Sequence, residues 1–142
     1  MLFRSVASNV VNLGGEKLPH APTFSTSFAY EHDIGLASGA RISPRAQVHY
    51  QTRTKLGPFG EVDARYPVAA QATPDARFQK AYGTVDLSVR YEEAKGKWFL
   101  EAFVVNAGDE HVKTDASWVT NSTWTSFYNP PRTYGLRAST RF

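Results

Sequence analysis

The 142-residue sequence contains no cysteine. Disulfides, thiolate chemistry and the zinc sites built on cysteine are therefore excluded. The chain also lacks any uninterrupted apolar run near the roughly 18 residues of a transmembrane helix, which excludes a helical membrane protein. Its histidines are not spaced as metal ligands, and it holds no phosphate-binding glycine motif, nucleophile elbow or HExxH. We therefore expect no enzyme, no metal and no cofactor.

The chain also lacks a large excess of either positive or negative charge. Lys and Arg number 16 and Asp and Glu 13, for a net charge of +3, and the basic residues are scattered along the chain. A nucleic-acid-binding protein would need a clustered Lys/Arg face. We therefore expect no nucleic-acid partner.

The first residues also lack the charged-then-apolar order of a signal peptide.

The sequence does have alternation of period two. In residues 132–142 one set of alternate positions is mainly apolar and the other polar, which indicates a strand with two different faces. Similar patterns at 23–32, 40–51 and 82–91, and an apolar run at 97–107, predict four more strands. Pro44 lies inside the second of these segments, and because proline removes a ladder hydrogen bond we expect a local irregularity there.

The lengths of the strands and connections indicate an architecture. Soluble strands typically run about 5–6 residues, whereas tilted membrane-spanning strands need roughly 9–11. Short turns join 23–32 to 40–51 and 82–91 to 97–107, while the connections 52–81 and 108–131 are long. Short turns at one end and long loops at the other are typical of transmembrane barrels. The sequence thus predicts an all-β, antiparallel up-and-down transmembrane β-barrel segment, of about five long strands that cannot close alone.

The closing segment P-R-T-Y-G-L-R-A-S-T-R-F resembles the last strand of TonB-dependent outer-membrane receptors and, more generally, the C-terminal signal of bacterial outer-membrane barrels. The residues that match this assembly signal are Gly135, Ala138, Thr140 and Phe142, although larger apolar or aromatic residues are common at the positions of Ala138 and Thr140. The segments G-E-K-L-P-H-A-P and V-N-A-G-D-E resemble two other stretches of the same family.

The resemblance implies that residues 1–142 are the C-terminal part of a receptor barrel whose plug domain and earlier strands lie upstream. Such a receptor takes up a siderophore or another scarce nutrient across the outer membrane of a Gram-negative cell. The implied partners are outer-membrane lipid, the barrel assembly machinery, a small-molecule ligand such as an iron chelate, and the TonB complex, reached through the absent N-terminal part.

Three further groups of residues have expected roles in such a barrel. Aromatic side chains collect at membrane interfaces, and the candidates near strand ends are Tyr50, Tyr82, Tyr91 and Trp98. A cation facing lipid at the midplane costs roughly 2–4 kcal/mol, so we expect the lumen to contain Arg90, Arg137 and Arg141. The family resemblance suggests ligand contact through aromatic residues of the second long connection, which are Trp118, Trp124, Phe127 and Tyr128.

Two alternatives remain open from the sequence. One is a soluble β-sandwich module that binds a ligand such as carbohydrate through Trp118 and Trp124. The other is a different outer-membrane barrel, of porin type, with the same terminal signal. The strand lengths and loop asymmetry argue against the soluble module, and the two additional family-like segments favour the receptor over other barrels.

Overall fold

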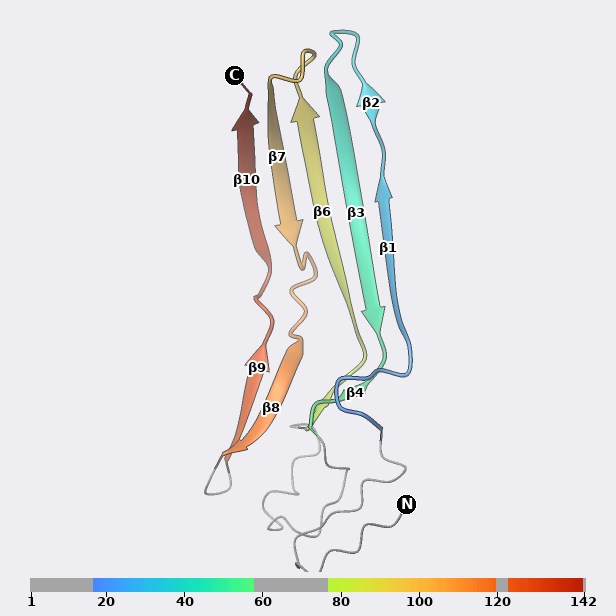
Figure 1. Ribbon diagram of the computed structural model, residues 1–142, viewed down its shortest axis with the longest axis vertical. Coiled ribbons are helices and arrows are strands. Elements are labelled where there is room, and N and C mark those ends of the chain that lie inside the picture. The colour runs from blue at the N-terminus through green and yellow to red at the C-terminus, as the bar shows by residue number, and fades with distance from the viewer. Residues whose placement is uncertain (1–16, 58–76, 120–122, 142) are drawn as a thin grey trace, which may run out of the picture.

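The computed structural model describes residues 17–57, 77–119 and 123–141, and these form antiparallel β-sheets without a helix. The main sheet has the order β1-β3-β6-β7-β10, so each long strand lies beside the preceding long strand (Figure 1). Its members are β1 (Ser25–Glu31) with the short β2 (Ile34–Gly35), β3 (Arg41–Gln51), β6 (Tyr82–Glu92), β7 (Trp98–Val105) and β10 (Thr133–Thr140). The five predicted strands and their up-and-down order are confirmed. None of the described segments is a helix that could cross a membrane.

The irregularity expected at Pro44 is confirmed on one side of β3. Strands β1 and β2 pair with β3 in one continuous register, from Glu31 opposite Arg45 to Ile34 opposite Ile42. Strand pairing is interrupted between them at His32 and Asp33, which lie opposite Pro44 and Ser43. Since proline has no N–H to donate, only the reverse bond remains, from the His32 N–H to the Pro44 carbonyl at 3.1 Å.

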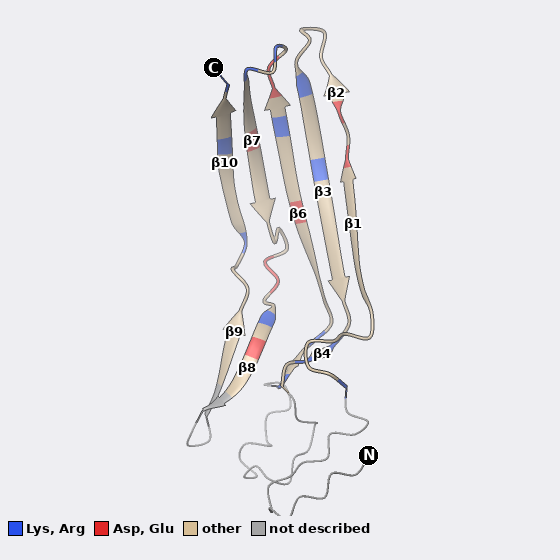
Figure 2. Cartoon of the chain, in the orientation of Figure 1, with Lys and Arg blue, Asp and Glu red and all other residues tan. Residues whose placement is uncertain are grey.

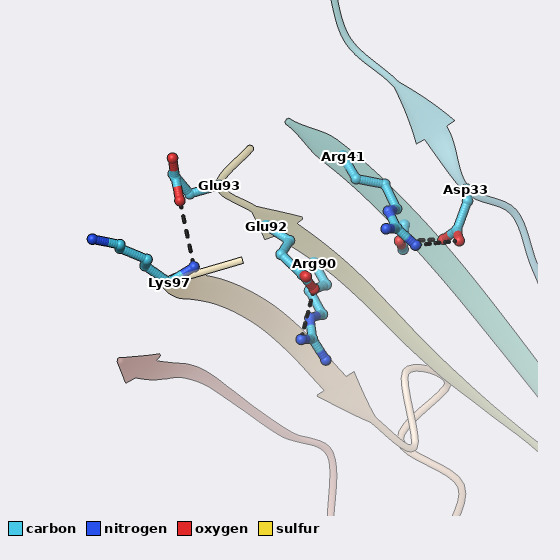
Figure 3. Close-up of polar contacts among 7 residues, drawn as sticks. Asp33, Arg41, Arg90, Glu92, Glu93 and Lys97 are labelled. Atoms are coloured by element: carbon cyan, nitrogen blue, oxygen red, sulfur yellow. Dashed lines mark hydrogen bonds and ion pairs between the residues drawn. The ribbon is translucent and has the colours of Figure 1, made fainter. Parts of the chain in front are cut away.

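Both short turns lie at the same end of the sheet (Figure 1). In each turn a glycine adopts a left-handed conformation, Gly39 with φ 85° and Gly96 with φ 66°. Such φ values favour glycine because it has no Cβ. The second turn is also held by the Glu93 carboxylate, which accepts hydrogen bonds from the backbone N–H groups of Lys95 and Lys97. Figure 3 shows the bond from Lys97.

The two long connections lie at the opposite end, and both contain strands that the alternation did not predict. The first contributes β4 (Thr54–Lys55) and β5 (Phe78–Gln79), which pair just beyond β3 and β6. The second contains the hairpin of β8 (Lys113–Val119) and β9 (Thr123–Tyr128). The alternation predicted no strand within residues 108–131. The register shifts between Lys113 and Asp115, and a bulge of this kind breaks the period-two pattern that reveals a strand.

The register of the main sheet gives it one face without a charged strand residue. Residues paired across antiparallel strands share a face, so the pairing divides the strand residues into two sets. The uncharged set, called the apolar face below, consists of Thr26, Phe28, Tyr30, Ile34, Ile42, Pro44, Ala46, Val48, Tyr50, Gly83, Val85, Leu87, Val89, Tyr91, Trp98, Leu100, Ala102, Val104, Tyr134, Leu136, Ala138 and Thr140.

The described residues form no second layer that covers the apolar face. Phe28, Tyr134 and Leu136 are 66%, 79% and 74% exposed, and no large side chain of the described residues is fully buried. The few buried apolar residues lie outside the long strands or in the hairpin of the second long connection; they are Ala40, Leu56, Val112 and Ala116. A soluble sheet ordinarily packs one face against another layer. This sheet instead exposes its most hydrophobic surface.

Candidate functional site

The opposite face, called the polar face below, carries charges of both signs in close pairs. Figure 2 shows these charged positions along β3, β6 and β10, and Figure 3 shows two of the pairs. The nitrogen–oxygen distances are 3.0 Å for Arg41–Asp33, 3.9 Å for Arg45–Glu31, 2.8 Å for Arg90–Glu92 and 3.1 Å for Arg137–Glu101. Partly exposed pairs of this kind each contribute only about 0–1 kcal/mol. Their main effect is that each of these arginines has its charge balanced by a carboxylate on the same face.

Two phenylalanines of β7 also lie on the polar face and are covered by arginines. The Arg90 guanidinium carbon is 3.9 Å from the centre of the Phe99 ring, and that of Arg137 is 5.5 Å from the centre of Phe103. Cations at this distance are attracted to the face of an aromatic ring. This explains why residues 97–107 read as apolar on both faces, although only one face of β7 belongs to the apolar face.

Gly135 fits the Phe103 ring closely across the β7–β10 pair. The two residues are directly opposite, and a Cβ added to Gly135 would lie 2.8 Å from Cζ of Phe103. An aromatic ring that covers a glycine on a neighbouring strand shields the exposed backbone there. The sequence singled out Gly135 only as part of a terminal signal. The structure gives it a packing role in addition.

Replacing Gly135 with Val is therefore expected to destabilise the β7–β10 pair. The added side chain must displace the Phe103 ring, and overpacking of this kind costs roughly 1–3 kcal/mol. The matched control is Gly35→Val, because Gly35 also lies in a strand and a Cβ added to it would have no other atom within 4 Å. Urea unfolding of each variant measures the difference. A loss for G135V that is as large in an F103A background as in the original protein would contradict this packing role.

The end of β7 is fixed by a buried asparagine in a left-handed conformation. Asn106 has φ 52° and is 6% exposed. Its side chain bonds twice to Glu110, accepting from the backbone N–H and donating to the carbonyl, each at 2.9 Å. Its own N–H donates to Asp86 Oδ1 of β6 at 2.8 Å. The next residues are tied to the start of β10, since the Arg132 N–H donates to the Asp109 carboxylate at 2.9 Å.

Asp33 lies between β1 and β2, and two side-chain hydrogen bonds lower its pKa. Its carboxylate accepts hydrogen bonds from the Ser43 hydroxyl and then from Arg41, and these hold the pKa of Asp33 below its ordinary 3.8. Because these bonds favour the ionised carboxylate, they stabilise the folded chain above about pH 3.8. That stabilisation is lost as the pH falls through the lowered pKa of Asp33 in the folded state. We expect Ser43→Ala to raise the Asp33 pKa, measured by NMR titration. An unchanged pKa would contradict the assigned cause.

The predicted aromatic residues divide between the two faces. Tyr91 and Trp98 lie together near the short turns, with ring centres 5.3 Å apart, and Tyr50 lies near the long connections beside Phe24. All but Phe24 belong to the apolar face defined above. Tyr82 is on the polar face instead, because it pairs with Gln51 and donates to that side chain at 3.4 Å. Of the four residues predicted for a membrane interface, Tyr50, Tyr91 and Trp98 therefore share the apolar face and Tyr82 does not.

The remaining predicted residues are spread over β6, β10 and the hairpin. Arg90 and Arg137 lie on the polar face, and Ala138 and Thr140 on the apolar face opposite Leu100 and Trp98. The backbone N–H of Arg141, just after β10, donates to the Lys97 carbonyl. In the hairpin, Trp118 pairs with Trp124, and Phe127 and Tyr128 are exposed. Phe142 lies outside the described residues.

Tyr128 lines an open pocket of about 280 Å³ at the long-connection end. The other lining residues are Phe78, Gln79, Lys80, Glu110, His111 and Lys113. A second open hollow, of about 230 Å³, lies on the polar face, and its lining includes Arg45, Asp86, Glu101 and Arg137. Within the described ranges no cluster of His, Asp and Glu could hold a metal ion. Sequence reasoning did not identify either hollow, because each depends on how separate strands align.

Comparison of the chain with protein-family models, with curated proteins and with solved structures finds no match. Functional inference therefore rests on the two faces of the sheet, its turns and the residues at its long-connection end.

Proposed function

We propose that this sheet is part of the wall of a transmembrane β-barrel, with its apolar face toward lipid and its polar face toward the lumen. One observation carries the proposal. The apolar face extends over all five long strands without a charged strand residue, yet most of its large side chains are exposed. Lipid hydrocarbon is an environment that favours such a surface, whereas water does not.

The dimensions and ends of the sheet support the same proposal. Strands β3 and β6 each have 11 residues, which is enough for a tilted strand to span a bilayer. The short turns gather at one end and the long connections at the other (Figure 1), as in barrels with short periplasmic turns and longer outer loops. Tyr91 and Trp98 would then lie at the periplasmic interface, and Tyr50 at the outer interface.

The finer proposal is that the barrel belongs to a TonB-dependent receptor for a siderophore or another scarce nutrient. It is supported by the resemblance of the closing segment and of the V-N-A-G-D-E stretch to that family. In this proposal the residues at the long-connection end, including Phe127 and Tyr128, contact the incoming ligand from outside. The four paired arginines face the lumen, where the plug of such a receptor would lie.

The location is tested in cells that naturally make the protein. An antibody against residues 108–131 is used to follow it through separation of the soluble, inner-membrane and outer-membrane fractions. The proposal predicts a band in the outer-membrane fraction that resists carbonate extraction and migrates differently when the sample is not boiled. A band that is entirely soluble would contradict it and would favour the β-sandwich module.

The receptor proposal needs its own test. Deletion of the gene should reduce uptake of at least one compound from a panel of labelled ferric chelates and cobalamin. Uncoupling the inner-membrane energy source should reduce uptake in the parent strain to the level of the deletion strain. Unchanged uptake of the whole panel, with the protein in the outer membrane, would favour a porin-like barrel instead.

A further inference from the structure

The open pocket at the long-connection end is formed by two connections that are far apart in the sequence. One side comes from β5, and the other comes from residues 110–113 and from Tyr128 at the end of β9. The two sides are joined where the Lys113 N–H donates to the Gln79 side-chain oxygen at 2.6 Å. Gln79 is buried, and its amide nitrogen donates to the Lys80 carbonyl at 3.1 Å. A buried side chain therefore fixes the two sides relative to each other.

The side made by residues 110–113 is also held from two other directions. Asn106 bonds twice to the backbone of Glu110. The N–H of Asn129 donates to the carbonyl of the buried Val112 at 2.9 Å. A pocket whose walls are fixed by the fold needs little further ordering when it binds a ligand.

The charged side chains that line the pocket have an excess of positive charge. Lys80 and Lys113 stand against a single carboxylate, that of Glu110, and His111 adds a further cation when it is protonated. The Lys113 Nζ lies 3.4 Å from the Phe78 carbonyl, so this ammonium group reaches across to the β5 side. Because charge-assisted hydrogen bonds are roughly twice as strong as neutral ones, the pocket favours an anionic group over a neutral one.

The pocket also has aromatic walls. Phe78 and Tyr128 line it, and the Arg53 guanidinium carbon lies 3.8 Å from the centre of the Phe78 ring. Hydrophobic and aromatic side chains with a few polar groups are the usual lining of ligand sites, and aromatic side chains pair favourably with other rings. The volume of about 280 Å³ lies just below the roughly 300–1,000 Å³ of typical ligand pockets. It therefore suits a small molecule or one arm of a larger one.

We infer that this pocket binds an aromatic carboxylate. The carboxylate lies toward Lys80 and Lys113. The ring lies against Phe78 and Tyr128. This inference rests on the proposed function, in which the long-connection end meets the incoming ligand, and it narrows that ligand to a compound that carries an aromatic anion.

Three matched compounds test the two features separately. Benzoate, benzamide and cyclohexanecarboxylate are similar in size, but the second lacks the charge and the third lacks the aromatic ring. Their dissociation constants are measured by saturation-transfer NMR titration of the whole protein, purified in detergent from the outer membranes of the cells that naturally make it. Benzoate should bind about tenfold more tightly than benzamide and about threefold more tightly than cyclohexanecarboxylate.

Variants of exposed residues assign the charge preference to the pocket. Lys80→Gln should weaken benzoate binding by about tenfold and leave benzamide unchanged, whereas Lys80→Arg should keep the affinity for benzoate. Glu110→Gln should strengthen benzoate binding by roughly two- to fivefold, because it removes a like charge. The control is Lys95→Gln, an exposed lysine in a short turn at the opposite end of the sheet, which should change neither affinity. The mobility shift of unboiled samples confirms that each variant is folded.

The inference is overturned if benzoate does not bind, if benzoate and benzamide bind equally, or if K80Q behaves like K95Q. None of these results bears on membrane location or on uptake, so the barrel-wall and receptor proposals would stand. Failure of the proposed function itself is detected separately, by the fractionation and uptake experiments.

Discussion

Leu87→Arg should lower the ratio of folded to unfolded protein in the outer membrane by roughly 30- to 1,000-fold. Leu87 lies in the central strand β6, between Ala46 of β3 and Val104 of β7 on the apolar face. A cation on the lipid side near the midplane costs roughly 2–4 kcal/mol, and each 1.4 kcal/mol corresponds to about tenfold. The adjacent residue gives a matched control, because Ser88 lies on the polar face opposite Arg45. Ser88→Arg should change the ratio by less than about threefold, as expected for a surface substitution.

The measurement is urea unfolding of each variant in outer membranes isolated from the cells that naturally make the protein, followed by the mobility shift of unboiled samples. Equal destabilisation by L87R and S88R would contradict the assignment of the two faces. A larger effect of S88R would reverse it, with the polar face toward lipid.

Asn106→Ala should destabilise the chain by roughly 3–4 kcal/mol, since it removes two side-chain hydrogen bonds worth about 1 kcal/mol each and forces alanine into a left-handed conformation that costs about 1–2 kcal/mol. The bonds are those to the backbone of Glu110, and φ at this position is 52°. The consequence extends to β10, because the segment that follows Asn106 also bonds to Arg132. We therefore expect β10 to lose protection from hydrogen exchange before β3 does.

Two variants separate the contributions at this position. Asn106→Gly keeps the left-handed conformation and loses only the side-chain bonds, so its cost should be smaller than that of alanine. Asn129→Ala is the control for an exposed asparagine, and it should have little effect. The role assigned to this turn is wrong if N106A and N129A unfold at the same urea concentration.

Alternation in the sequence was sufficient to predict four of the long strands, because the face on which each residue lies is set by period two alone. Strand β7 was predicted from an apolar run instead, since Phe99 and Phe103 make its second face apolar as well. Glycine and polar residues similarly revealed the short turns, as at Gly39 and Gly96. The hairpin of β8 and β9 was missed because its alternation is short, with a register shift at the start of β8 and the pair Ser126-Phe127 interrupting the pattern in β9. Short and interrupted alternation does not reveal a strand.

Contacts between strands were not predictable in the same way. The bond from Asn106 to Asp86 joins residues 20 positions apart and depends on how β6 aligns with β7. The fit of Phe103 over Gly135 depends equally on the alignment of β7 with β10. Composition gave no sign that the arginines would be paired within their own sheet. These features arise from register, which is fixed only once the sheet is assembled.

The most direct test of the two-faced sheet is the accessibility of spin labels along β6. Single cysteines at positions 85 to 89 are introduced in turn into the gene of the natural host and labelled in isolated outer membranes. A barrel wall with the apolar face toward lipid predicts alternation, with labels at Val85, Leu87 and Val89 more accessible to oxygen dissolved in the bilayer, and labels at Asp86 and Ser88 more accessible to a water-soluble nickel complex. Accessibility to the nickel complex that is uniform along the strand, or highest at Leu87, would contradict the assignment of the apolar face to lipid.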